Sequence, residues 1–201
     1  MTTTDGVSTV LVAVDTRSKD VSAAEHVVHD LDQALGAADL DAYVASTHVV
    51  RDDLGPHLAV AAGWLAPAAA APALLDRVAS RFPGAGVAVD RAGWAGPADL
   101  VAGARSALAE HRSRQGGRLV RFPGQAEIER RLTVEEVLAL SCVDVVSGLA
   151  GVEINPRSEL DLTGFVRPTW HDGQCTVLVQ QSVHGLIPFE VRDQIPCCAA
   201  H

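Results

Sequence analysis

The order of apolar and polar positions in residues 1–124 predicts alternating strands and helices. Residues 9–14 are continuously apolar and β-branched, which is typical of a strand covered on both faces. Ser22 and Glu25 form a capping-box start, and apolar residues then follow at helical spacing until Gly36. The same reasoning predicts strands at residues 9–14, 42–46, 86–89 and 118–122, and helices at residues 22–35, 52–65, 72–82 and 97–111.

This alternation predicts an α/β fold with a mainly parallel sheet flanked by helices. A strand followed by a helix and a second strand usually forms a right-handed crossover, which leaves the two strands parallel. The helices of successive crossovers then cover the faces of the sheet.

The pattern changes after residue 124. Thr133 and Glu136 form a second capping box, which predicts another helix. Strand-like segments follow at residues 160–166, 175–180 and 186–191. The sequence therefore predicts an α/β domain at residues 1–124 and, at residues 125–201, a helix plus an antiparallel β meander. This C-terminal portion either extends the first sheet or forms a small second domain.

Charge and hydropathy argue against two classes of partner. The net charge is −9, and residues 1–100 carry 13 acidic and 6 basic side chains, so this half repels nucleic-acid phosphates. The apolar stretch at residues 58–75 is interrupted by Gly63, Pro67 and Pro72, which is untypical of a membrane span. We therefore expect neither nucleic-acid binding nor membrane insertion.

The composition also predicts where the protein works. The first residues contain neither a basic segment nor a signal-like apolar core, which favours the cytoplasm. One lysine beside abundant arginine, alanine, valine and leucine is typical of a GC-rich bacterial genome. Because thiols stay reduced in the cytoplasm, the four cysteines are expected to be free or metal-bound.

Polar residues that follow the predicted strands form the first candidate site. Ligands of parallel α/β sheets bind beyond the carboxyl ends of the strands. Asp15 and Arg17 follow the first strand, His48 follows the second, and Asp90 and Arg91 follow the third. We expect Asp15 or His48 to act as the catalytic acid or base, and the other three residues to bind a polar metabolite. The alternative is that all five only cap helices and turns.

The C-terminal tail forms the second candidate site. Cys197, Cys198 and His201 offer ligands that zinc or another transition metal prefers. Cys175 and His171 have a spacing that could complete a metal site with the tail, and His184 lies in the next predicted turn. The alternatives are idle thiols with a solvated histidine, thiol chemistry, or a strained disulfide between the two adjacent cysteines.

Several motifs are absent, which narrows the function. No GxGxxG follows the first strand, and neither a phosphate-binding P-loop nor a GxSxG nucleophile elbow occurs. NAD-dependent redox chemistry, P-loop phosphoryl transfer and α/β-hydrolase chemistry are therefore disfavoured. The favoured interpretation is a small cytoplasmic bacterial enzyme that acts on a polar metabolite in a biosynthetic pathway. The alternative is a non-catalytic binding or scaffold subunit that docks a partner protein or a second copy of itself.

Overall fold

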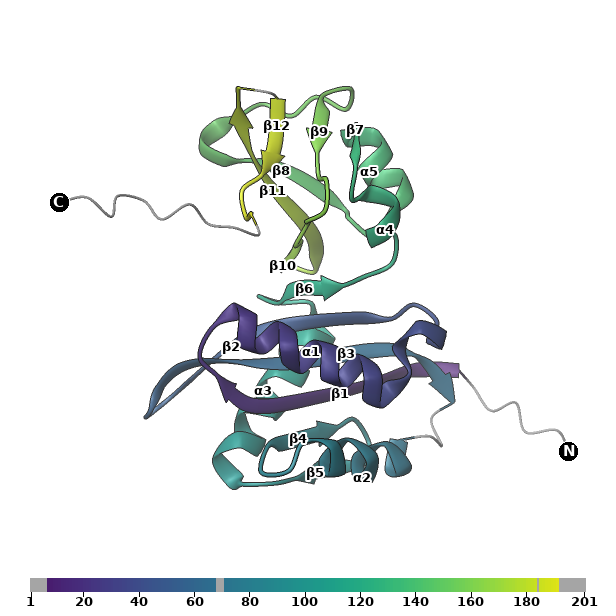
Figure 1. The fold of residues 1–201 in the computed structure, drawn as a ribbon, viewed down its shortest axis with the longest axis vertical. Helices are drawn as coiled ribbons and strands as arrows, with labels where there is room; N and C mark the ends of the chain where they lie inside the picture. Colours follow the sequence, from purple (N-terminus) through teal and green to yellow (C-terminus); the bar gives the residue numbers. More distant parts are fainter. Residues whose placement is uncertain (1–6, 68–70, 184, 192–201) are drawn as a thin grey trace, which may run out of the picture. The chain divides into compact units, whose positions relative to one another are not determined.

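The computed structural model of the protein describes residues 7–67, 71–183 and 185–191, and it divides into two compact units (Figure 1). The first unit comprises the described residues up to Pro123 together with Thr169–Gly173. The second comprises Gly124–Pro168 and the described residues from Gln174 onward. None of the helices in these described ranges combines the length and hydropathy that crossing a bilayer requires.

The first unit is built on an antiparallel sheet with the strand order β5-β4-β1-β3-β2-β6-β10. Its strands are β1 (Val7–Ser18), β2 (Val44–Asp52), β3 (Gly55–Pro67), β4 (Gly86–Val89), β5 (Gly93–Ala95), β6 (Arg118–Arg121) and β10 (Thr169–His171). Its helices are α1 (Val21–Leu35), α2 (Ala71–Arg81) and α3 (Ala98–Ser113), with a short 3-10 helix at Ala37–Asp39.

The predicted mainly parallel sheet is therefore wrong, and the reason lies in one segment. Residues 52–65, predicted as a helix, form the end of β2, a tight turn and most of β3. The pairing of β2 with β3 runs without interruption from Asp52 opposite Gly55 to Val44 opposite Gly63. The alanines of β3 favour a helix locally, but residues 59–64 are all buried, as in a strand covered on both faces.

Because β3 is a strand inside the sheet, the neighbouring strands of the sheet pair antiparallel and not parallel. β1 and β2 run in the same direction and are joined through α1, as a crossover requires, but β3 lies between them and runs the opposite way. In the same manner β1 lies between β3 and β4, which are joined through α2. This is the split β-α-β connectivity of ferredoxin-like sheets, in which the strands of a crossover never touch.

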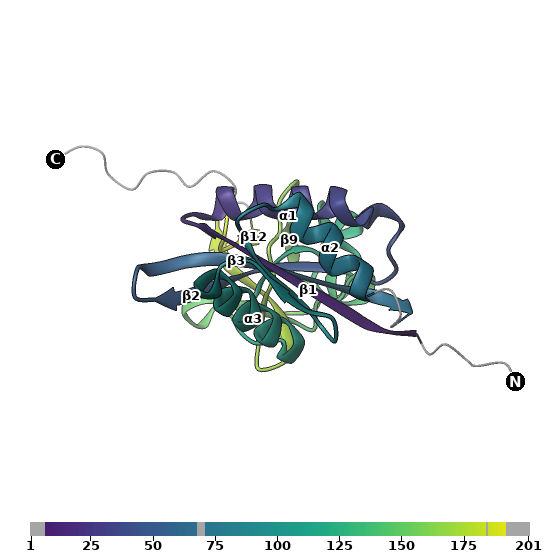
Figure 2. The same ribbon diagram turned by 90° about the horizontal axis from the view of Figure 1, so that it is seen from below.

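Helices cover both faces of this sheet (Figure 2). Successive residues of β1 therefore face alternate helical layers. Val10, Val12 and Val14 face the apolar layer formed by α1 and α2. Leu11 and Ala13 face α3, which packs through small residues such as Ala104 and Ala107. The α1–α2 face is closed by apolar side chains, whereas the α3 face also buries polar ones.

The second unit is a smaller α+β arrangement. It contains α4 (Gln125–Ile128), β7 (Arg131–Thr133), α5 (Val134–Leu140), β8 (Val145–Gly148), a 3-10 helix (Leu149–Gly151), β9 (Glu159–Asp161), β11 (Gln174–Ser182) and β12 (Gly185–Pro188). The capping box of Thr133 and Glu136 is present and begins α5. The predicted antiparallel meander is wrong in part: β11 and β12 are antiparallel, but β9 pairs with β12 and β8 pairs with β11 in parallel.

Candidate functional site

Five polar side chains are buried between α3 and the sheet of the first unit. They are Asp15, Ser46, His48, His57 and His111, each at most 5% exposed. Residues two apart on a strand point to the same face, so Ser46 and His48 of β2 both face α3. These side chains belong to two separate hydrogen-bonded groups.

The first group is a continuous chain of four side chains from β2 and α3. Glu110 Oε2 lies 3.0 Å from His48 Nδ1, and His48 Nε2 lies 2.8 Å from Ser46 Oγ. Ser46 Oγ in turn lies 2.7 Å from His111 Nδ1. Both interior contacts are within the normal range of hydrogen bonds that involve a hydroxyl group. The four residues thus connect Glu110, which is 38% exposed, to the buried ring of His111.

Donor and acceptor rules fix the protons along this chain. An ionised Glu110 carboxylate only accepts, so His48 Nδ1 carries a proton and donates it. A neutral His48 then accepts at Nε2 from the Ser46 hydroxyl, whose oxygen accepts from His111 Nδ1–H. His111 Nε2 is left as an unprotonated acceptor.

Burial keeps both imidazoles neutral near pH 7. Burial, followed by the charges of His48 and Arg114, lowers the pKa of His111 to about 3. Burial also lowers the pKa of His48 below its ordinary value, although the hydrogen bond and charge of Glu110 act in the opposite direction. The proton arrangement above is therefore the resting one at neutral pH.

Two glycines and a tryptophan hold the rings in place. A Cβ atom at Gly63 would lie 3.0 Å from His111 Nε2, and one at Gly117 would lie 2.5 Å from His48 Cε1. Trp170 packs against His111 in a T-shaped contact, with ring centroids 4.8 Å apart. The Trp170 backbone N–H donates to the Gly117 carbonyl at 2.8 Å, which fixes β10 beside the same rings.

His111 also lines a cavity of about 500 Å³ in the first unit. Trp170 of β10 and Leu11 of β1 contribute apolar wall, together with Gly63 of β3. Trp64 also borders the cavity, but it lies opposite Val10 and its side chain packs in the apolar layer of α1 and α2. The charged lining residues are Asp90, Arg91, Arg112 and Arg114. Three arginines against one aspartate give the cavity a positive lining, although the whole chain has a net charge of −9.

Two of the three arginines, Arg91 and Arg114, lie where the chain reverses direction. Arg114 caps α3 in the left-handed conformation, with φ at 53°, and Arg91 has φ at 62° in the turn after β4. Non-glycine residues rarely adopt this conformation, which costs about 1–2 kcal/mol per residue. Arg112 pairs with Asp90 at 2.7 Å, which joins the end of α3 to the turn.

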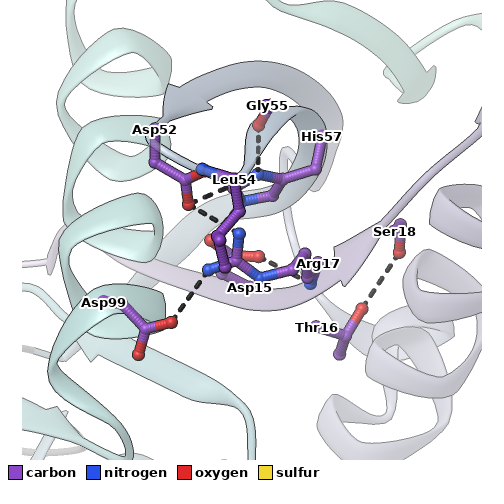
Figure 3. A network of polar contacts seen from close by, with 9 residues as sticks. All are labelled: Asp15, Thr16, Arg17, Ser18, Asp52, Leu54, Gly55, His57 and Asp99. Atoms are coloured by element: carbon purple, nitrogen blue, oxygen red, sulfur yellow. Dashed lines mark hydrogen bonds and ion pairs between the residues drawn. The ribbon is translucent and has the colours of Figure 1, made fainter.

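The second buried group is centred on Asp15 and lies at the other end of β1 (Figure 3). Asp15 Oδ2 lies 2.9 Å from His57 Nε2, and Asp15 Oδ1 accepts from the Arg17 backbone N–H at 2.7 Å. The guanidinium of Arg17 lies between Asp52 and Asp99 and donates to them at 2.7 and 2.8 Å. This group ties together β1, the β2–β3 hairpin and α3.

The five residues that were expected at one edge of a parallel sheet lie in three places. Asp15 and Arg17 belong to the group in Figure 3, and His48 belongs to the buried four-residue chain. Asp90 and Arg91 line the cavity. Since β1 and β4 are antiparallel, Asp15 lies opposite the start of β4 and Asp90 lies near Leu11, so the ends of these strands do not converge.

The predicted metal ligands are only partly described. Cys197, Cys198 and His201 lie outside the described residues, as does His184. Cys175 is buried on β11, and His171 is exposed on β10, where Nε2 lies 3.5 Å from Asp172 Oδ2. Within the described ranges, no group of three or more His, Cys, Asp or Glu residues is placed to hold a metal ion. The zinc site stays a prediction.

Sequence reasoning did not point to His111, Arg114 or His57 as site residues. His111 lies one turn beyond Ala107 and Leu108 on the buried side of α3, so its position on an apolar helix face was a usable signal. Its partner Ser46 is far away in the sequence, and only the antiparallel sheet brings the two together.

Comparison with models of known protein families, with curated proteins and with solved structures finds no match to this chain.

Proposed function

We propose that the first unit is an enzyme that binds a small anionic metabolite in the arginine-lined cavity and transfers a proton through His111. The observation that carries the proposal is the neutral imidazole of His111, a residue that lines a cavity with three arginines. The reaction class that fits is proton abstraction from a carbon next to a carboxylate or carbonyl group.

The charge of the cavity supports an anionic ligand. Guanidinium groups bind carboxylates and phosphates through paired hydrogen bonds, which makes arginine well suited to this role. Arg91 and Arg114 each keep a strained backbone conformation that glycine would adopt freely. Such strain is commonly retained where a side chain has a functional role.

The surroundings of His111 support proton transfer. Histidine is the side chain best matched to acid–base chemistry near neutral pH, and a negative ligand beside it would raise its low proton affinity. Trp170, which packs against the His111 ring, and Leu11 reduce the water around it, which strengthens the interaction of the ring with a bound charge.

Composition supports the wider setting of this proposal. The balance of arginine over lysine supports a bacterial source, and the proposed enzyme acts in the cytoplasm. A biosynthetic pathway, with a small polar metabolite as substrate, remains part of the proposal.

Ligand-induced stabilisation tests the anion site. A panel of small carboxylates and phosphates should raise the Tm, because a ligand that binds only the folded state stabilises it. The Arg91→Gly and Arg114→Gly variants should fold and lose this effect. For any ligand that binds, the exchange of a C–H proton for deuterium in D₂O should depend on His111 and stop in His111→Gln. If no anion stabilises the protein, or if the glycine variants respond like the parent, the alternative of a non-catalytic binding subunit is favoured.

A further inference from the structure

We propose that Ser46, His48 and Glu110 form a proton relay behind His111, which turns His111 from a hydrogen-bond acceptor into a hydrogen-bond donor without charging it. The proposal deepens the function proposed above, because the relay would serve the proton transfer at the same cavity. Its geometry does not depend on which ligand binds there.

The relay is geometrically complete. Its three contacts measure 3.0, 2.8 and 2.7 Å, and each joins a group that can donate to one that can accept. Ser46, His48 and His111 are shielded from solvent, so water does not compete for these hydrogen bonds.

The chain is open at both ends, which distinguishes a relay from a closed structural network. At one end His111 lines the cavity, and at the other end Glu110 reaches solvent. Buried polar groups can be satisfied by a network that is closed on itself, so hydrogen bonding alone does not require a path from the cavity to the surface. Within the described part of the chain, no side-chain hydrogen bond is formed at His111 Nε2, and the proposal assigns this atom to the ligand.

The proton movement balances in three transfers. A proton arrives at His111 Nε2, and the proton on His111 Nδ1 passes to Ser46 Oγ. The original hydroxyl proton of Ser46 passes to His48 Nε2. His48 becomes an imidazolium ion that still donates from Nδ1 to the Glu110 carboxylate. His111 is neutral before and after, but it now carries its proton on Nε2 and donates into the cavity.

The surrounding charges favour His48 as the place where the positive charge rests. Glu110 of α3 faces His48, and among the described residues no carboxylate is bonded to His111. Arg114 at the end of α3 repels a charge on His111. Arg112 of α3 and the Asp90–Arg91 turn after β4 complete the charged groups around the cavity. A shared proton is therefore more stable on His48 than on His111.

The relay predicts that anion binding takes up a proton. Sulfate is a suitable probe because it accepts hydrogen bonds only and stays fully ionised between about pH 5 and pH 8, the range in which histidine normally titrates. To donate to sulfate, His111 must carry its proton on Nε2, which requires one proton on the relay. The affinity for sulfate should therefore rise by up to about tenfold for each unit by which the pH falls.

Two variants break the relay at different points. In Ser46→Ala, His111 can change tautomer without passing a proton on, so sulfate should bind with an affinity that no longer depends on pH. In Glu110→Gln, the hydrogen bond to His48 can remain but its negative charge is lost, so the pH dependence should move to lower pH. Glu135→Gln removes an exposed carboxylate from α5 in the second unit and serves as the control.

Nitrogen NMR of the histidine rings provides the deciding readout, which needs no ligand. In the parent protein, acidification should protonate His48 and move the His111 proton from Nδ1 to Nε2. An imidazolium signal from His111 at the pH at which His48 takes up its proton, or an identical His48 titration in Ser46→Ala, would overturn the relay. If sulfate binds with no pH dependence, the relay is wrong and the anion site stands. If sulfate does not bind while the tautomer change occurs, the relay stands and the proposed anion site is wrong.

Discussion

Replacing Gly103 by alanine should destabilise the protein, although alanine is the better helix former. Gly103 lies in the middle of α3 on the side that faces the sheet. A Cβ atom added there would overlap with Asp15 Oδ2 and would lie only 3.0 Å from Asp15 Cγ and 3.3 Å from Val50 Cγ1. Asp15 is fully buried and cannot move without giving up its bonds to His57 and the Arg17 backbone.

Two opposing contributions to the free energy of unfolding of Gly103→Ala differ in size. Alanine gains about 1 kcal/mol over glycine in a helix interior. Against this, each hydrogen bond to a charged group contributes about 1.5–3 kcal/mol, and two of them hold the Asp15 carboxylate. The alternative is that α3 moves outward by about an ångström, which leaves a gap over Ala13 and Ala61 and loses packing energy of similar size. We expect a net loss of about 2–4 kcal/mol, or a fall in Tm of about 5–10 °C.

Thermal and urea unfolding of four proteins tests this reasoning. The parent, Gly103→Ala, Asp15→Ala and the double variant form a mutant cycle, in which Gly103→Ala should become stabilising once the carboxylate is absent. Ala102→Gly, at an exposed position of the same helix, measures the helix-propensity contribution by itself. If Gly103→Ala stabilises the parent by the amount that Ala102→Gly costs, the close approach of α3 to Asp15 is refuted.

Four further predictions follow from the fold and the site. Val12 is completely buried in β1, so Val12→Asp should prevent soluble folding, and a soluble variant with an unchanged Tm would contradict this placement. Arg114→Gly should leave the Tm unchanged or higher, because glycine relieves the left-handed strain, while sulfate affinity measured by calorimetry falls several-fold. Because burial lowers the pKa of His111 from 6.5 to about 3, its contribution to stability is complete above pH 6.5 and is lost as the pH falls toward 3. The urea-unfolding free energy should decline there by up to about 1.4 kcal/mol per pH unit, and His111→Gln should flatten this slope. The predicted zinc site requires that metal analysis find about one equivalent of metal that disappears when Cys197 and Cys198 become serine; an equal metal content in both proteins would exclude the tail as ligand.

Local signals in the sequence were sufficient for most helices of the first unit. Proline at residue 97 and the helical spacing of apolar residues placed α3, which spans Ala98–Ser113. The helix predicted from residue 22 is also present as α1, although its cap is Asp20, whose side chain accepts from the Ala23 N–H, and not Ser22. Capping is decided within a few residues, so a sequence reveals it approximately even when the exact capping residue differs.

The direction of the strands could not be obtained in this way. Both faces of β3 are covered, so its sequence lacks the alternation of polar and apolar residues that would identify a strand. Alanine and glycine occupy these positions instead. Mistaking this one strand for a helix converts a split β-α-β arrangement into a parallel sheet. The candidate site depends on the same strand assignment, because the Ser46–His111 hydrogen bond forms only when β2 packs against the end of α3.

The order of the chain has a consequence for the way the cavity is completed during synthesis. β10, which carries Trp170, belongs to the first unit but is made only after residues 124–168 of the second unit. A nascent chain that has reached Pro123 therefore contains His111 and all three cavity arginines, but it lacks the tryptophan ring that packs on His111 and the N–H that donates to the Gly117 carbonyl. The first unit cannot be isolated with an intact cavity by cutting the chain at its apparent boundary, and the cavity forms late, after much of the second unit has been translated.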